Sequence, residues 1–206
     1  MFITFEGPEG SGKTSVIKAI CAYLDEKKVD YLHTREPGGT PIAEQIRDVV
    51  LDKCNTALDA RAEALLIAAS RRQHLVEKIW PALKEGKVVL CDRFLDSSLA
   101  YQGGARNLGV EAVLRINEFG TEGSMPDVTV LFDLRPEVGL ARIAANAKRE
   151  VNRLDLEELA FHTKVRETFL QLAHDDPARY IIVNAELPLA EVIEATKKII
   201  SKVLKL

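Results

Sequence analysis

Short apolar runs that alternate with longer segments of helical periodicity most constrain the fold of this 206-residue chain. The runs are rich in β-branched and aromatic residues and have the length of buried strands. The strands that they predict are residues 2–6, 29–34, 87–93, 127–134 and 180–185. Because parallel strands need crossover connections, which helices supply, this order predicts an α/β fold with helices on both faces of a parallel sheet.

Segments of helical period fill the intervals between these strands. The first helix should begin near Lys13 and the second after Pro41, and a long helical pattern runs over residues 59–83. The remaining helices are expected at residues 108–119, after Pro136, at residues 155–173 and at the C-terminus. The sequence has no internal repeat or linker, so we expect one domain over residues 1–206.

A glycine-rich loop follows the first predicted strand. Gly7-x-x-x-x-Gly12-Lys13-Thr14 matches the Walker A pattern in its required place between a strand and a helix. Backbone N–H groups in such a loop attract phosphates, the lysine can reach the β- and γ-phosphates, and the threonine can bind Mg²⁺. A turn with an incidental Lys-Thr is the alternative that this spacing disfavours. We assign ATP binding to Gly7, Pro8, Glu9, Gly10, Ser11, Gly12, Lys13 and Thr14.

Composition excludes several other classes of protein. A net charge of -3 argues against a nucleic-acid binder that acts through a basic surface. No apolar run approaches the roughly 20 residues of a membrane helix. The 3 cysteines form no C-x-x-C pair, and the 4 histidines lack metal-ligand spacing. We expect a soluble cytoplasmic protein without a leader, in a reducing compartment, that binds no nucleic acid or membrane.

A phosphate loop does not distinguish a nucleotide switch from a kinase with a second substrate. A GTPase switch would carry D-x-x-G after a strand, and the third strand instead ends in "CDRF". The string "NRLD" at residues 152–155 resembles N-K-x-D, but it lies in a charged segment ahead of a helix and has arginine for lysine. We interpret it as a false match, and the switch remains the less favoured alternative.

Five sequence blocks resemble bacterial thymidylate kinases. They are "FITFEGPEGSGKT", "TREPGGT", "LLIAASRRQH", "VVLCDRFLDSSLAYQG" and "NRLD", in the family's order across nearly the whole chain. The resemblance implies a P-loop nucleoside-monophosphate kinase fold with a five-stranded sheet and a short mobile lid, assembled as a homodimer. It implies Mg²⁺-assisted in-line transfer of the γ-phosphoryl group of ATP to dTMP. Another acceptor such as dUMP remains an alternative.

Charged residues at the third strand and in the segment 146–155 supply candidate catalytic groups. Asp92 can help Thr14 hold Mg²⁺, and Arg93 can bridge the two phosphate groups, although a buried ion pair is the alternative. By composition the segment 146–155 is a solvated charge run, but the resemblance implies a lid whose arginines reach the phosphates on closure. The catalytic set is Lys13, Asp92, Arg93, Arg149 and Arg153.

The resemblance also implies an acceptor pocket. Arg47 would bind the acceptor phosphate, Arg71 would reach the base, and Tyr101 would disfavour a 2′-hydroxyl. Spacing alone fits polar helix faces equally well. The implied substrate-binding set is Glu9, Glu36, Arg47, Ile67, Arg71, Arg93, Ser98, Tyr101 and Gln102. The family usually has phenylalanine at position 67, and isoleucine covers a base with apolar surface but offers no ring face.

Glu9 places a carboxylate inside the loop that should hold phosphate. It would repel a bound triphosphate unless it points elsewhere. A solvent-facing glutamate is one interpretation. The resemblance implies the other, in which Glu9 faces the acceptor pocket and accepts a hydrogen bond from the sugar 3′-hydroxyl.

Overall fold

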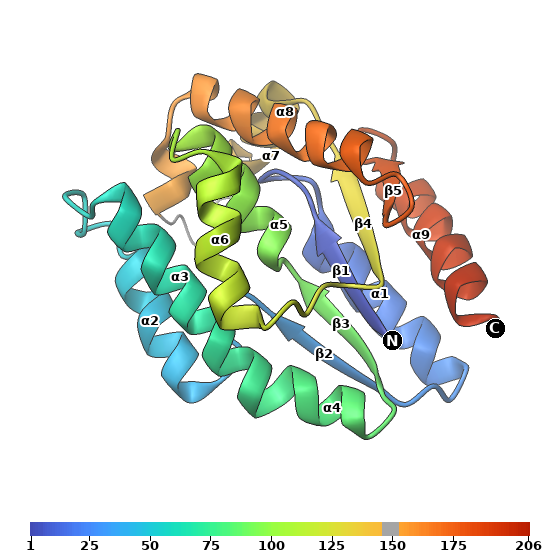
Figure 1. Ribbon diagram of the computed structural model, residues 1–206. Helices are drawn as coiled ribbons and strands as arrows, with labels where there is room; N and C mark the ends of the chain where they lie inside the picture. The colour runs from blue at the N-terminus through green and yellow to red at the C-terminus, as the bar shows by residue number, and fades with distance from the viewer. Residues whose placement is uncertain (146–152) are drawn as a thin grey trace.

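The computed structural model describes residues 1–145 and 153–206. Its five strands form one parallel sheet in the order β2-β3-β1-β4-β5 (Figure 1). The strands are β1 (Phe2–Glu6), β2 (Tyr31–Arg35), β3 (Val88–Asp92), β4 (Val128–Asp133) and β5 (Tyr180–Asn184). All five predicted strands are therefore confirmed, and the central strand β1 delivers the glycine-rich loop to the middle of the sheet edge.

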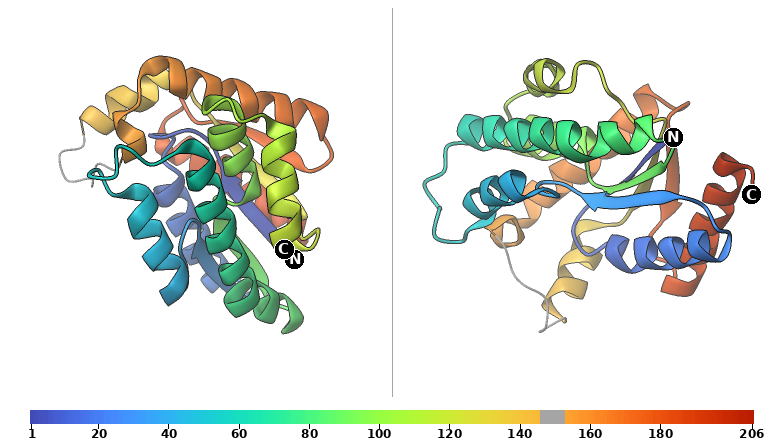
Figure 2. Two further views of the ribbon diagram at one scale, coloured as in Figure 1. Left: turned by 60° about the vertical axis from the view of Figure 1, so that its left-hand side comes forward. Right: turned by 90° about the horizontal axis from the view of Figure 1, so that it is seen from below.

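Helices cover both faces of the sheet (Figure 2). Helices α1 (Lys13–Glu26) and α9 (Leu189–Leu204) pack together on one face. The other face is covered by α4 (Trp80–Lys84), α5 (Leu95–Ser98), α6 (Val110–Thr121) and α8 (Leu159–Asp175). At the loop end lie α2 (Pro41–Leu51), α3 (Ala60–His74) and α7 (Pro136–Ala144). Within the described ranges, no helix combines the length and apolar content needed to span a membrane.

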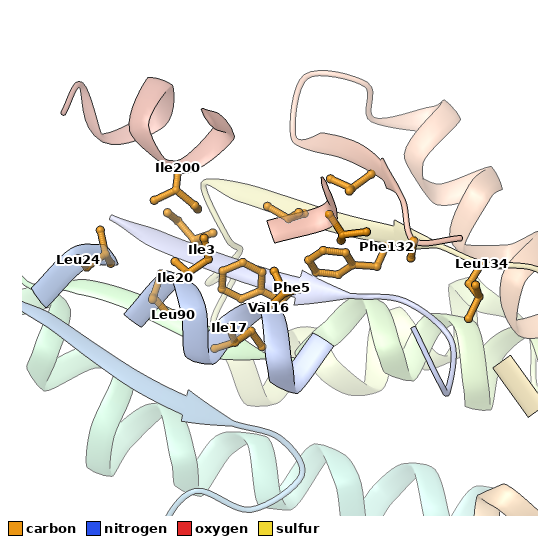
Figure 3. Packing of buried hydrophobic residues seen from close by; sticks show 14 residues of the cluster. Ile3, Phe5, Val16, Ile17, Ile20, Leu24, Leu90, Phe132, Leu134 and Ile200 are labelled. Carbon is orange, nitrogen blue, oxygen red and sulfur yellow. The ribbon is translucent and has the colours of Figure 1, made fainter. Parts of the chain in front are cut away.

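Side-chain alternation along β1 divides its residues between the two faces. Ile3 and Phe5 point into the core beneath α1, where Ile17 and Ile20 recur at helical spacing (Figure 3). The intervening residues point to the opposite face, because successive side chains of a strand alternate. Glu6, the last residue of β1, consequently belongs to the face covered by α5.

The long helical pattern over residues 59–83 is confirmed, with one local change. After α3 the chain forms a π-helical turn, η1 (Leu75–Ile79), and continues directly into α4. The Trp80 N–H donates to the Leu75 carbonyl five residues back. Pro81 follows at the first turn of α4, and a proline lacks an N–H and crowds the carbonyl four residues before it. The wider turn accommodates this crowding.

The helix expected over residues 155–173 begins later than the sequence pattern indicated. A 3₁₀ turn, η3 (Arg153–Leu156), comes first, and α8 starts at Leu159. Arg153 in this turn donates to the carbonyl of Val50 at the end of α2 and to Glu63 in α3. These tertiary contacts, which no local pattern contains, hold the turn against two other helices.

The phosphate loop packs directly on α7. A Cβ added at Gly10 would lie 2.4 Å from the carbonyl oxygen of Gly139, and Gly10 has a φ of +75°. Gly86 has a similar φ of +79°, but nothing lies within 4 Å of a Cβ added there. Of these two glycines, therefore, only Gly10 combines left-handed backbone with a close steric contact.

Replacing Gly10 with alanine should lower the free energy of unfolding more than replacing Gly86. Both changes place a Cβ on left-handed backbone, at a cost of roughly 1–2 kcal/mol. The Gly10→Ala variant must also shift the loop away from α7, which should add about 1–3 kcal/mol. Urea unfolding of the two variants measures the difference. Equal losses would show that α7 yields without cost.

Candidate active site

A cavity of about 440 Å³ lies at the carboxyl ends of β1, β2 and β3. The phosphate loop forms one side of it, and residues that follow β2 and β3 form the other. The structure brings the following predicted site residues to its lining: Glu9, Gly10, Ser11, Gly12, Lys13, Thr14, Glu36, Arg47, Ile67, Arg71, Asp92, Arg93, Ser98, Tyr101 and Gln102. One cavity thus joins the loop to the second set of predicted ligands.

Lys13 lies over the concave side of the loop. Its Nζ donates to the carbonyls of Gly7 and Pro8 at 3.0 and 3.2 Å and to Ser11 Oγ at 3.2 Å. Burial, together with the nearby cation of Arg93, lowers the pKa of Lys13 to about 8. An anionic ligand would favour the protonated lysine, since opposite charges stabilise each other.

Gly12 caps the N-terminus of α1 with left-handed backbone and contributes no side-chain cap. In an α-helix the first N–H groups have no partner within the helix. These free N–H groups form the positive end of the helix dipole, and such a terminus commonly binds phosphate. The loop geometry thus agrees with the Walker A assignment.

Glu9 does not face solvent. Its Oε1 accepts from Arg93 Nη2 at 2.7 Å and from the Tyr101 hydroxyl at 3.1 Å, and its side chain is only 14% exposed. The Arg93 guanidinium also lies over the Tyr101 ring, 5.1 Å from its centroid. The Glu9 carboxylate therefore points toward residues that follow β3.

Arg93 occupies an unusual backbone position, with a φ of 66°. Left-handed backbone is uncommon for residues other than glycine and concentrates at functional sites. Its Nη1 donates to the Gly7 carbonyl at 3.0 Å and to Ser97 Oγ at 3.1 Å. The phosphate loop and the helix after β3 thus both fix the guanidinium.

Asp92 and Thr14 offer oxygen atoms to the same cavity. Asp92 Oδ1 is buried and has no hydrogen-bond partner among the described residues. No group of three or more potential metal-ligating side chains occurs in residues 1–145 and 153–206. This donor set fits Mg²⁺, which takes few protein ligands and keeps waters and phosphate oxygens as the rest.

Glu6 is a buried carboxylate that was not among the residues predicted from the sequence. It is fully buried and accepts from the Phe94 N–H at 2.7 Å and from the Ser97 hydroxyl at 2.6 Å. Burial, aided by the nearby carboxylate of Asp96, raises the pKa of Glu6 to about 7. The sequence did contain one signal for Glu6. A charged residue at the end of an apolar strand indicates a buried carboxylate that needs hydrogen-bond partners.

Arg71 is held rigidly at the back of the cavity and is 2% exposed. Its Nε donates to Glu36 at 2.8 Å, its Nη1 to Ser98 at 3.0 Å and also to Asn117, and its Nη2 to the Phe94 carbonyl at 2.9 Å. Glu36 also pairs with the buried His74. The predicted residues Glu36, Arg71 and Ser98 are therefore brought together in one network.

The remaining acceptor residues lie around this network. Arg47 lines the cavity, and its Nη1 donates to the Pro37 carbonyl at 2.9 Å. Ile67 is 7% exposed and Gln102 is 2% exposed, and both line the cavity. Gln102 donates to Glu63, a buried residue that was not predicted from the sequence either.

Of the two arginines predicted to lie in the lid, the structure describes Arg153 only. Arg149 lies outside the described residues. Arg153 is 8% exposed and is bound to Glu63 and the Val50 carbonyl, and it is not part of the cavity lining. The structure thus joins Arg153 to Glu63, which also binds Gln102, and not to the phosphate loop.

A second cavity of about 440 Å³ adjoins the outer side of the loop. It is lined by the loop, by Arg142 and by residues 185–189 after β5. Arg142 Nη1 donates to the Ala185 carbonyl at 2.8 Å. The sequence did not identify Arg142 as a candidate, because an arginine in a helix is not distinctive by itself.

The pH dependence of stability should change when Glu6 is replaced by glutamine. The folded-state pKa of Glu6 is raised from 4.5 to about 7, so the folded protein holds this proton longer than the unfolded chain. Stability from this group is complete below pH 4.5 and is lost as the pH rises toward 7. Glu6→Gln should remove a loss on the order of 3 kcal/mol across that window.

Denaturant unfolding of both proteins from pH 4.5 to 7 measures this effect, and the difference between the two curves cancels the other titrating groups. Parallel curves would contradict the raised pKa of Glu6.

Residues 5–196 match the family model described as thymidylate kinase. A thymidylate kinase of Clostridium novyi (strain NT) is 60% identical over 196 residues, which are 95% of this chain and 96% of the relative. Those of Anoxybacillus flavithermus and Bacillus velezensis are 58% and 55% identical, over 94% and 100% of this chain and 93% and 97% of theirs. Because the matches extend over nearly the whole length of both partners, the chain belongs to the thymidylate kinase family.

Proposed function

We propose that this chain transfers the γ-phosphoryl group of ATP to dTMP, which yields dTDP and ADP. The observation that carries the proposal is the position of Glu9. It leaves the phosphate loop to pair with Arg93 and Tyr101 in a cavity that also holds Arg71 and Gln102. A switch protein whose acceptor is water needs no such second pocket beside its loop.

Positioning and charge neutralisation account for the chemistry. ATP and a nucleoside monophosphate repel each other, and transfer requires their phosphates to lie in line. Lys13 and the α1 N-terminus would hold the donor phosphates, and Arg93 lies between the loop and the acceptor side. Arg47, which lines the cavity, would bind the acceptor phosphate through its planar donor fork.

Thr14 and Asp92 would hold Mg²⁺ through their oxygen atoms. When bound, the ion neutralises charge on the β- and γ-phosphates. The second cavity, beside Arg142, would take the base of the donor nucleotide, since a guanidinium offers a planar face for stacking.

The acceptor nucleoside would lie between the loop and the Arg71 network. Its 3′-hydroxyl would donate to Glu9, while the Tyr101 ring occupies the space beside the 2′-carbon. Ile67 would cover the base with apolar surface, and Arg71, Ser98 and Gln102 would provide its polar partners. Glu36 supports this arrangement by holding Arg71.

We also propose roles for the lid arginines and a homodimer. Arg149 and Arg153 would reach the phosphates in a closed state, and Arg153 would leave Glu63 to do so. In a homodimer, α3 and α6 would form the interface, because Leu65 and Phe119 on these adjacent helices are 56% and 93% exposed.

A panel of acceptors tests the proposed activity. With ATP and Mg²⁺, ADP release should be fast with dTMP and should fall strongly with dUMP, dCMP, dAMP or thymidine. A coupled assay of ADP formation measures this. Equal turnover with dUMP would identify a broader pyrimidine kinase, and ADP release that ignores every acceptor would contradict the proposal.

Glu9→Gln should lower kcat/KM for dTMP by about 10–100-fold, since it removes the charge that pairs with Arg93 and accepts from the sugar. The dissociation constant of ATP should change far less, because the hydrogen bonds of Glu9 join it to Arg93 and Tyr101 on the acceptor side. Steady-state kinetics and calorimetry measure the two quantities.

Glu85→Gln is the matched control, because it breaks an exposed pair with Lys87 at the opposite end of the sheet. Full turnover of dTMP by the Glu9→Gln variant would show that Glu9 has no part in acceptor binding.

A further inference from the structure

We propose that Glu63 decides which pyrimidine bases the acceptor pocket admits, by fixing the orientation of the Gln102 amide. The proposal rests on the function proposed above, since it concerns the base pocket of that site. Glu63 would touch no substrate atom itself. It is therefore a positioning residue that acts through Gln102.

Glu63 lies in α3 with its side chain 1% exposed. Its Oε1 accepts from Gln102 Nε2 at 2.8 Å. Its Oε2 accepts from Arg106 at 3.5 Å and also from Arg153. A buried carboxylate is tolerated only when cations and hydrogen bonds compensate its charge, and the two guanidinium groups meet this need.

A carboxylate with two arginine partners can only accept hydrogen bonds. The Gln102 amide must therefore turn its NH₂ group toward Glu63, and its Oε1 must face the other way. This network fixes the orientation by chemistry, because the reversed amide would place two acceptor oxygens in contact. Among the described residues no donor reaches Gln102 Oε1, and Gln102 lines the cavity. The pocket consequently offers an acceptor at this point.

Arg71 offers the complementary donor. The N–H of its Nε donates to Glu36, and the two N–H groups of Nη1 donate to Ser98 and Asn117. One N–H of Nη2 donates to the Phe94 carbonyl. Within residues 1–145 and 153–206 the other N–H of Nη2 has no partner, and Arg71 lines the same cavity. A donor and an acceptor thus line the same cavity.

This pair matches one class of pyrimidine. Thymine and uracil carry a carbonyl oxygen at C4 and an N–H at N3, which satisfy a donor and an acceptor respectively. Cytosine carries an amino group at C4 and a bare N3, so both contacts would be repulsive. A site built for one pattern rejects the other strongly, because its own buried polar groups are left unpaired.

Two variants of Glu63 test the proposal. Glu63→Gln can present either an oxygen or an NH₂ group to Gln102, so the amide of Gln102 becomes able to turn. Glu63→Asp keeps the negative charge for Arg106 and Arg153, but its carboxylate ends about 1.5 Å short of Gln102. In each variant the ratio of kcat/KM for dTMP to that for dCMP should fall by about tenfold or more, the effect of one lost hydrogen bond.

Glu157→Gln is the matched control. Glu157 pairs with the same Arg106 at 2.6 Å, and no hydrogen bond joins it to Gln102 within the described part of the chain. The control should keep the ratio of the unchanged protein. A general loosening of this region would lower turnover of both nucleotides in all variants and would leave the ratio in place.

A double-mutant cycle with Gln102→Ala tests whether Glu63 acts through Gln102 or in another way. If Glu63 acts through Gln102, Glu63→Gln should change the ratio no further once Gln102 is alanine. Additive effects would overturn the proposal, as would a ratio that both single variants leave unchanged in a chain that phosphorylates dTMP. A failure of the unchanged chain to turn over dTMP would instead count against the proposed function.

Binding of dTMP and dCMP, measured by calorimetry without ATP, gives the same ratio independently of turnover. Thermal unfolding checks that Glu63→Gln and Glu63→Asp are folded. If one of them does not fold, the other alone tests the proposal. If the unchanged chain binds dCMP as tightly as dTMP, Glu63 does not select the base.

Discussion

The buried carboxylate of Glu6 joins the end of β1 to the turn after β3, and the site depends on this junction. It accepts the Phe94 N–H and the Ser97 hydroxyl, and Ser97 in turn accepts from Arg93. Arg93 can then occupy left-handed backbone and reach both the loop and Glu9. Strained backbone persists only where its surroundings over-determine it, and here hydrogen bonds from several segments do so. Hydrogen bonds thereby join the ends of β1 and β3 into one rigid edge of the cavity.

The acceptor side follows the same plan, with buried carboxylates behind the groups that face the ligand. Glu36 holds Arg71, and Glu63 holds Gln102. Glu36 also pairs with His74, and Glu63 also pairs with Arg106 and Arg153. Because side chains locked by such partners lose little freedom on binding, the pocket is organised before a ligand enters.

Much of the fold was predictable because its signals are local. Strand length, helical period and the loop spacing are written in consecutive residues, and all five strands and the long helical pattern are confirmed. The late start of α8 and the π-helical turn before Pro81 were not predicted. The first depends on contacts of Arg153 with α2 and α3, and the second on how one proline is accommodated within a continuing helix.

The sequence by itself determined the parallel sheet, the phosphate loop and the set of residues around it, since each rests on short-range spacing or on blocks shared with a family. Only the tertiary structure decided where the polar groups point. Glu9 turns toward Arg93, Arg153 toward Glu63, and Arg142 toward the strand end near Ala185. The partners in these contacts lie between 43 and 90 residues apart along the chain. Only folding brings such groups together, and a sequence pattern cannot state which of several buried acceptors a given donor will meet.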